Sequence, residues 1–192
     1  DIWKRAQQCE PLSLIVFIKR AQTAMWLEDY ETGLQFVIDG EIRMGSNPWF
    51  AITKLWLYLG MGNAEEALKL APEVAKDRDF AGVMGWTAPL ALKGDIEEAR
   101  ARMMDWVARN GLSQWSELMV HAAMGDRNGA NALAAELDAS PAGPFLLLLT
   151  SVYCACGAPF DLEHTPNFAE RLDESGTQWP LATLIEYPAK DY

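Results

Sequence analysis

The chain has 192 residues, half of them hydrophobic, and a formal net charge of −11 at pH 7. This length suits one domain that buries a substantial core. The acidic balance excludes the clustered Lys/Arg surface that binds a nucleic-acid backbone, and it disfavours an anionic membrane surface equally. The longest apolar run, residues 145–149, is far short of the roughly 20 residues of a membrane-spanning helix.

Apolar residues recur with helical spacing, and no stretch alternates as a half-buried strand does. In chain order, we expect helices over 11–27, 29–43, 47–61, 63–77, 79–92, 95–109, 112–124, 126–138, 142–156 and 166–174. The pairs Asn47-Pro48, Ser140-Pro141 and Gly143-Pro144 mark helix starts, where the missing N–H of proline has no partner to lose. Pro89 falls inside an expected helix, which it should kink or shorten.

A short sequence motif that combines a turn with the start of a helix recurs along the chain. Its copies are Gly62-Asn63-Ala64-Glu65-Glu66-Ala67, Gly94-Asp95-Ile96-Glu97-Glu98-Ala99 and Gly125-Asp126-Arg127-Asn128-Gly129-Ala130. The glycines are 32 and 31 residues apart, a period typical of helix-pair repeats. Each Gly can end one helix in the left-handed conformation, and the next residue can cap the following helix. The Ala that closes each copy lets neighbouring helices approach, and Gly33 takes that place in a weaker upstream copy.

The Gly, the acidic pair and the small Ala resemble the tetratricopeptide repeat. The resemblance implies an all-α fold, a right-handed superhelical array of antiparallel helix pairs called an α-solenoid. A single domain over 1–192 would hold units at 11–43, 47–77, 79–110, 112–139 and 142–175, followed by a capping tail at 176–192. The units are degenerate, because the usual Trp position holds Phe17, Ala51, Val83, Gln114 and Leu146.

The last 30 residues carry a second resemblance. Trp179-Pro180, an Ile-x-x-Pro segment at 185–188 and the final Lys190-Asp191-Tyr192 are similar to the ending of a family of bacterial signalling proteins. In that family a class III adenylate or guanylate cyclase domain, or a CadC/ToxR-like winged-helix domain, precedes a tetratricopeptide region. The chain departs from the family pattern at Leu181 and at Tyr192. The chain also starts without Met or a leader, so we expect it to be the regulatory end of a longer protein.

The chain has few residues of the types that catalyse reactions or bind metal ions. His121 falls on the inward face of an expected helix, where a hydrogen-bonded structural role fits, and His164 precedes Pro166 in a loop where we expect it to be solvated. We interpret the three cysteines as buried thiols: Cys9, Cys154 and Cys156. The Cys-x-Cys pair does not suggest a joint site, because two such positions on a helix point their side chains about 200° apart. No phosphate-loop, nucleophile-elbow or zinc-protease motif is present. We therefore expect no enzymatic activity, no cofactor and no metal in this segment.

Eight tryptophans are many for this length, and aromatic anchors are enriched where proteins bind one another. The positions expected to line the groove of the array are Trp49, Ile52, Trp56, Met84, Trp115 and Met119. Such a strip would suit an apolar protein or peptide partner, and the alternative is that these residues pack in the core. A second hypothesis is homo-oligomerisation through apolar faces of the terminal units. A cyclase parent and unpaired cysteines favour the cytoplasm, whereas a CadC-like parent would place the domain in the periplasm.

Overall fold

The computed structural model describes residues 2–76, 80–154 and 158–180, and within these ranges every regular element is helical. The elements are α1 (Ile2–Cys9), α2 (Leu14–Trp26), α3 (Tyr30–Met44), α4 (Pro48–Gly60), α5 (Ala64–Val74), α6 (Phe80–Lys93), α7 (Ile96–Asn110), α8 (Gln114–Met124), α9 (Arg127–Asp138), α10 (Gly143–Cys154), the 3-10 helix η1 (Leu162–His164) and α11 (Pro166–Ser175). The all-α prediction is confirmed. The helix α1 lies ahead of the first predicted helix and was not anticipated.

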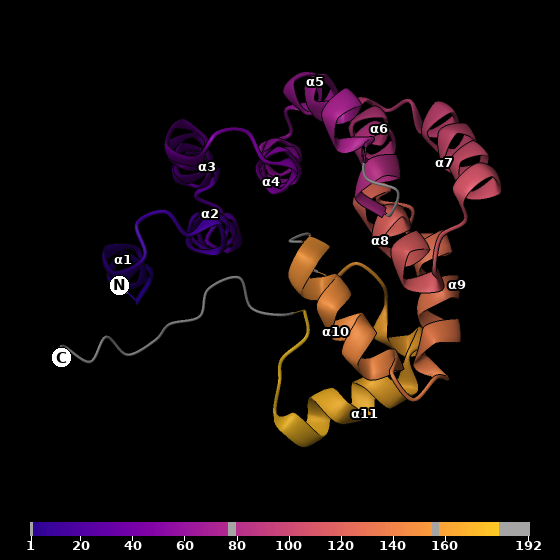
Figure 1. The fold of residues 1–192 in the computed structure, drawn as a ribbon. Coiled ribbons are helices and arrows are strands. Elements are labelled where there is room, and N and C mark those ends of the chain that lie inside the picture. The colour runs from indigo at the N-terminus through magenta and orange to yellow at the C-terminus, as the bar shows by residue number, and fades with distance from the viewer. Residues whose placement is uncertain (1, 77–79, 155–157, 181–192) are drawn as a thin grey trace.

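The helices are stacked side by side along an arc (Figure 1). Helices α2, α4, α6, α8 and α10 form the inner row, and each packs against the next one in that row. Helices α3, α5, α7 and α9 form the outer row, and each packs against the inner helix that precedes it. At the far end, α11 lies against α10 and α9. The packing is that of stacked helical hairpins.

The predicted glycine turns are present between the hairpin helices. Gly62, Gly94 and Gly125 have φ angles of 70°, 93° and 70°, the left-handed region in which a residue without Cβ is least strained. Each lies between an inner helix and the outer helix that follows it. The repeat found in the sequence is therefore a repeat of helix-ending turns.

The predicted helix caps are only partly correct. Asn63 accepts a hydrogen bond from the Glu66 N–H, and Asp126 accepts one from the Gly129 N–H. The side chain of Asp95 makes no such bond at the start of α7, so that cap was wrongly predicted. Acidic residues in the first turn of α7 still complement the positive end of the helix dipole.

Small residues allow the helices to approach closely, as the repeat predicted. Ala67, Ala99 and Ala130 are fully buried. A Cβ built on Gly33 would lie 2.7 Å from the Leu57 side chain and 3.1 Å from the Ala21 carbonyl oxygen, so a larger residue would force Leu57 to shift. These contacts set the spacing of the array.

The buried side chains form two clusters. The larger one runs through the hairpins from α2 to α8, and the smaller one joins α8, α9, α10 and α11. Trp179 of the tail belongs to the second cluster, where its ring centroid lies 5.2 Å from that of Phe160 and 5.3 Å from that of Phe168. The start of the predicted capping tail thus packs on the last helices, while its residues 181–192 lie outside the described residues.

The shortening predicted for the helix at Pro89 and the burial predicted for Cys9 were wrong. Pro89 does not shorten its helix, since α6 continues to Lys93. Most residues of α6 are buried, and this packing outweighs the roughly 3 kcal/mol that a proline costs inside a helix. Cys9 is exposed rather than buried, because α1 ends the array and packs on α2. The side chains of Cys154 and Cys156 lie outside the described residues.

Candidate partner-binding surface

Most of the predicted groove positions lie in the core. Ile52, Trp56, Met84 and Met119 are 8%, 9%, 0% and 0% exposed and belong to the larger buried cluster. Each comes from an inner helix that packs against two other inner helices and against the outer row. These neighbouring helices cover the four positions, which a more open array would leave accessible. The four side chains therefore pack in the core, which was the alternative to a groove. In this conformation they cannot contact a partner.

Trp115, a fifth predicted groove residue, is half-buried and serves as a link between helices. Its indole Nε1 donates hydrogen bonds to the Leu146 carbonyl at 3.2 Å and to the Thr150 hydroxyl at 3.0 Å. Its ring meets that of Phe80 edge-on at 5.6 Å. It thereby joins α8 to α10 and to the start of α6. Of the six predicted positions only Trp49, at the first turn of α4, is exposed, with 58% of its surface accessible.

The solvent-facing side of α10 is apolar, and the sequence analysis did not identify it. Phe145 is 62% exposed and Leu148 is 36% exposed, whereas Leu147 between them is fully buried. The apolar run 145–149 is the signal in the sequence that points to this face. Because each helical residue turns by about 100°, five consecutive apolar side chains surround the helix. Such a helix is either covered on every side, as residues 81–85 of α6 are, or it exposes an apolar face, as α10 does.

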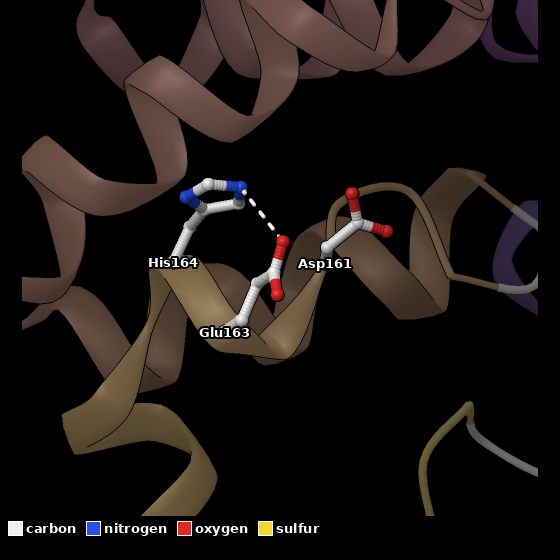
Figure 2. Close-up of side chains that lie close together, drawn as sticks. All are labelled: Asp161, Glu163 and His164. Atoms are coloured by element: carbon white, nitrogen blue, oxygen red, sulfur yellow. Dashed lines mark ion pairs between the residues drawn. The ribbon is translucent and has the colours of Figure 1, made fainter.

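One group of ionisable side chains lies on η1 and on the residue directly before it (Figure 2). Polar atoms of Asp161, Glu163 and His164 all lie within 4.8 Å of one another, and His164 Nε2 is 3.5 Å from Glu163 Oε1. The carboxylate of Asp161 already accepts a hydrogen bond from Asn131 Nδ2 at 2.7 Å, and the Asp161 N–H donates to Asn131 Oδ1 at 2.8 Å. Asp161 therefore ties η1 to α9. Glu163 and His164 are exposed, as predicted for His164, and nothing further indicates a cation at this place.

His121 has the structural role that the sequence predicted. Its Nδ1 lies 3.0 Å from Asp126 Oδ2, and its side chain is 20% exposed. The Arg100 guanidinium lies 3.6 Å from the other Asp126 oxygen. Burial raises the pKa of the Asp126 carboxyl, but the hydrogen bonds from the Gly129 N–H and His121, with the charges of His121 and Arg100, hold this pKa below its ordinary value.

We expect the stability contributed by Asp126 to disappear in acid. Because its pKa is lower in the folded chain than in the unfolded one, where it is about 3.9, the carboxylate stabilises the fold above about pH 4. That contribution is lost as the pH falls through the folded pKa. Asp126→Asn keeps an oxygen that can cap α9 but loses the charge, which should cost about 1 kcal/mol at pH 6.

Urea unfolding of the wild type and Asp126→Asn between pH 6 and pH 2.5 checks this. The two stabilities should converge below about pH 4. Asp126→Ala should be less stable than Asp126→Asn throughout, because it also loses the cap. A difference between wild type and Asp126→Asn that does not change with pH would contradict the assignment.

The fold places the chain in the class of all-α proteins built from stacked helical hairpins. Comparison with protein-family models, with curated proteins and with solved structures found no match to this chain. The helices among the described residues are too short or too polar to span a bilayer. The resemblance of the Trp-Pro ending to cyclase and CadC/ToxR-like proteins stays a prediction.

Proposed function

We propose that the chain is a protein-interaction module, non-catalytic by itself, that forms the regulatory part of a larger bacterial signalling protein. The hairpins would follow the right-handed tetratricopeptide arrangement, and the partner would be a protein or peptide segment. One observation carries the proposal: the side of α10 opposite its buried residues presents Phe145 and Leu148 to solvent. Large apolar side chains gathered on one exposed helix face are typical of protein-binding surfaces.

The chemistry of this face fits an apolar partner surface. Phe145 and Leu148 are three residues apart and lie on the same side of α10. Burying such side chains contributes about 1.5–3 kcal/mol each, which is enough for them to act as anchors. An amphipathic helix from the partner would offer matching apolar residues at helical spacing. Trp49 on α4, another inner helix, is a further exposed apolar side chain.

Photo-crosslinking tests the proposal. Benzoylphenylalanine in place of Phe145 should give an adduct of defined mass in cells that express the gene, because the face is occupied there. The same group in place of Met104, which is 72% exposed on α7, serves as the matched control and should give no such adduct. Adding Leu148→Ser should lower the yield at position 145 about tenfold, as expected for the loss of one apolar anchor. Identical adducts at both positions would refute the proposal.

Homo-oligomerisation is the second candidate, and exposed apolar residues on both terminal units favour it. Ile42 of α3 is 77% exposed, at the opposite end of the array from Phe145. Sedimentation at micromolar concentration distinguishes the candidates, since a self-associating chain would sediment faster as its concentration rises. Ile42→Ser or Phe145→Ser should abolish that dependence. A concentration-independent monomer would eliminate this candidate and leave the first one standing.

A further inference from the structure

A cleft of about 340 Å³ lies between α6 and α7. Its lining consists of two indoles, two guanidinium groups, one carboxylate and one valine: Val83, Trp86, Arg102, Asp105, Trp106 and Arg109. Helix α7 packs mainly on α6, and only Ala99 and Met103 of its residues are buried. Among the described residues, the cleft is therefore lined by side chains of these two helices alone.

The two arginines hold positive charge at the cleft. The Arg102 guanidinium carbon lies 5.0 Å from the centroid of the Trp86 ring, and its Nη2 and Nε donate to one oxygen of Glu98 at 2.8 and 3.0 Å. Arg109 is paired with Asp105 one turn earlier and is 64% exposed. A guanidinium has five N–H donors, so both groups keep donors that a ligand can use.

Trp106, which lines the cleft, carries a buried hydrogen-bond donor. Its indole Nε1 is buried and has no acceptor among the residues that the structure describes. A buried donor without a partner costs about 1–3 kcal/mol. Because the atom is buried, an acceptor can reach it only if neighbouring side chains move, and such an acceptor would remove this cost.

Charge and size restrict the kind of molecule that fits. The chain as a whole has a net charge of −11, and at the cleft each of the two guanidinium groups is paired with one carboxylate, Arg102 with Glu98 and Arg109 with Asp105. Arginine pairs well with carboxylates, and the faces of two indoles suit a flat ring. The volume is near the lower end of small-molecule pockets, which admits a molecule of one or two rings.

We propose that the cleft between α6 and α7 is a binding site for an aromatic carboxylate. Its ring packs against Trp86 and Trp106, and its carboxylate pairs with Arg102 and Arg109. The ligand is either a free aromatic acid or an aromatic side chain next to an acidic one in a peptide. The site is separate from the apolar face of α10, so it does not depend on the function proposed above.

Nitrogen-15 NMR of the tryptophan side chains, with calorimetry, tests the site on the full chain. The probes are indole-3-acetate and an acetylated, amidated Glu-Trp dipeptide, and the resonances are assigned with Trp86→Phe and Trp106→Phe. We expect saturable shifts of the Trp86 and Trp106 indole signals. The probe with the lower dissociation constant identifies the source of the ligand.

Two comparisons keep the test decisive. Arg102→Gln and Arg109→Gln should each weaken binding about tenfold, the loss of one charge-assisted hydrogen bond, and exposed ion pairs of this kind add little to folding. Arg171→Gln, which breaks an equally exposed pair with Glu174 on α11, should bind as the wild type does. The proposal is overturned if neither probe shifts the two signals at millimolar concentration. It is also overturned if neutral indole-3-acetamide binds as tightly as the acid.

Discussion

Replacing Asp138 with alanine is expected to detach α11 from the array and to lower the free energy of unfolding by about 3 kcal/mol. Asp138 is the last residue of α9, and it is 3% exposed. Its two carboxylate oxygens accept hydrogen bonds from the backbone N–H groups of Phe168 at 2.8 Å and Asn167 at 2.9 Å. These donors belong to the first turn of α11, where a helix has no acceptors of its own, and the negative charge suits that end of the helix dipole.

Urea unfolding, followed by tryptophan fluorescence, measures this effect. Trp179 packs on Phe168 of α11, so release of that helix should change its emission before the rest of the array unfolds. Asp138→Asn retains one acceptor and should lose about half as much stability. Asp173→Ala removes an exposed carboxylate from α11 itself and should change stability by less than about 0.5 kcal/mol. If Asp138→Ala and Asp173→Ala unfold alike, the buried cap does not hold α11.

The helices and the turns between them were predictable because their signals are local. Helical spacing of apolar residues and the Gly-Asn or Gly-Asp turns act within a few residues of each other. The bounds predicted for the middle helices, such as 95–109 against Ile96–Asn110, differ by one or two residues, except that α5 ends at Val74 rather than at 77. The helix α1 was missed because it has only eight residues and lies ahead of the repeat.

The surfaces of the array could not be predicted in the same way, because they depend on which helices meet. Ile52 and Met84 were assigned to a groove from their place in a repeat unit, but neighbouring inner helices cover them. Asp138 caps a helix that starts 28 residues later, and no local pattern reveals that pairing. The cleft beside Trp106 likewise depends on how α7 rests on α6. Phe145 is a partial exception, since an apolar run that surrounds its helix needs either cover on every side or an exposed face.

Gly143→Ala is expected to destabilise the fold by about 3 kcal/mol or more, because the new methyl group meets backbone that cannot move aside. A Cβ at Gly143 would lie 2.0 Å from the carbonyl oxygen of Leu137 and 3.0 Å from the Cα of Asp138. This is the end of α9, the segment from which Asp138 holds α11. Opening it would displace α10 and α11 together, so the variant should also lose the photo-adduct at Phe145.

Gly129→Ala is the matched control, because it makes the same change near the start of a neighbouring helix. Its Cβ would lie 2.2 Å from Nδ1 of the His121 ring, a side chain that can rotate away. The expected loss is about 1 kcal/mol, that of the hydrogen bond between His121 and Asp126. Thermal and urea unfolding of both variants separate the two cases. Equal losses would mean that the junction of α9 and α10 tolerates a methyl group. The position of the apolar face of α10 would then not depend on Gly143.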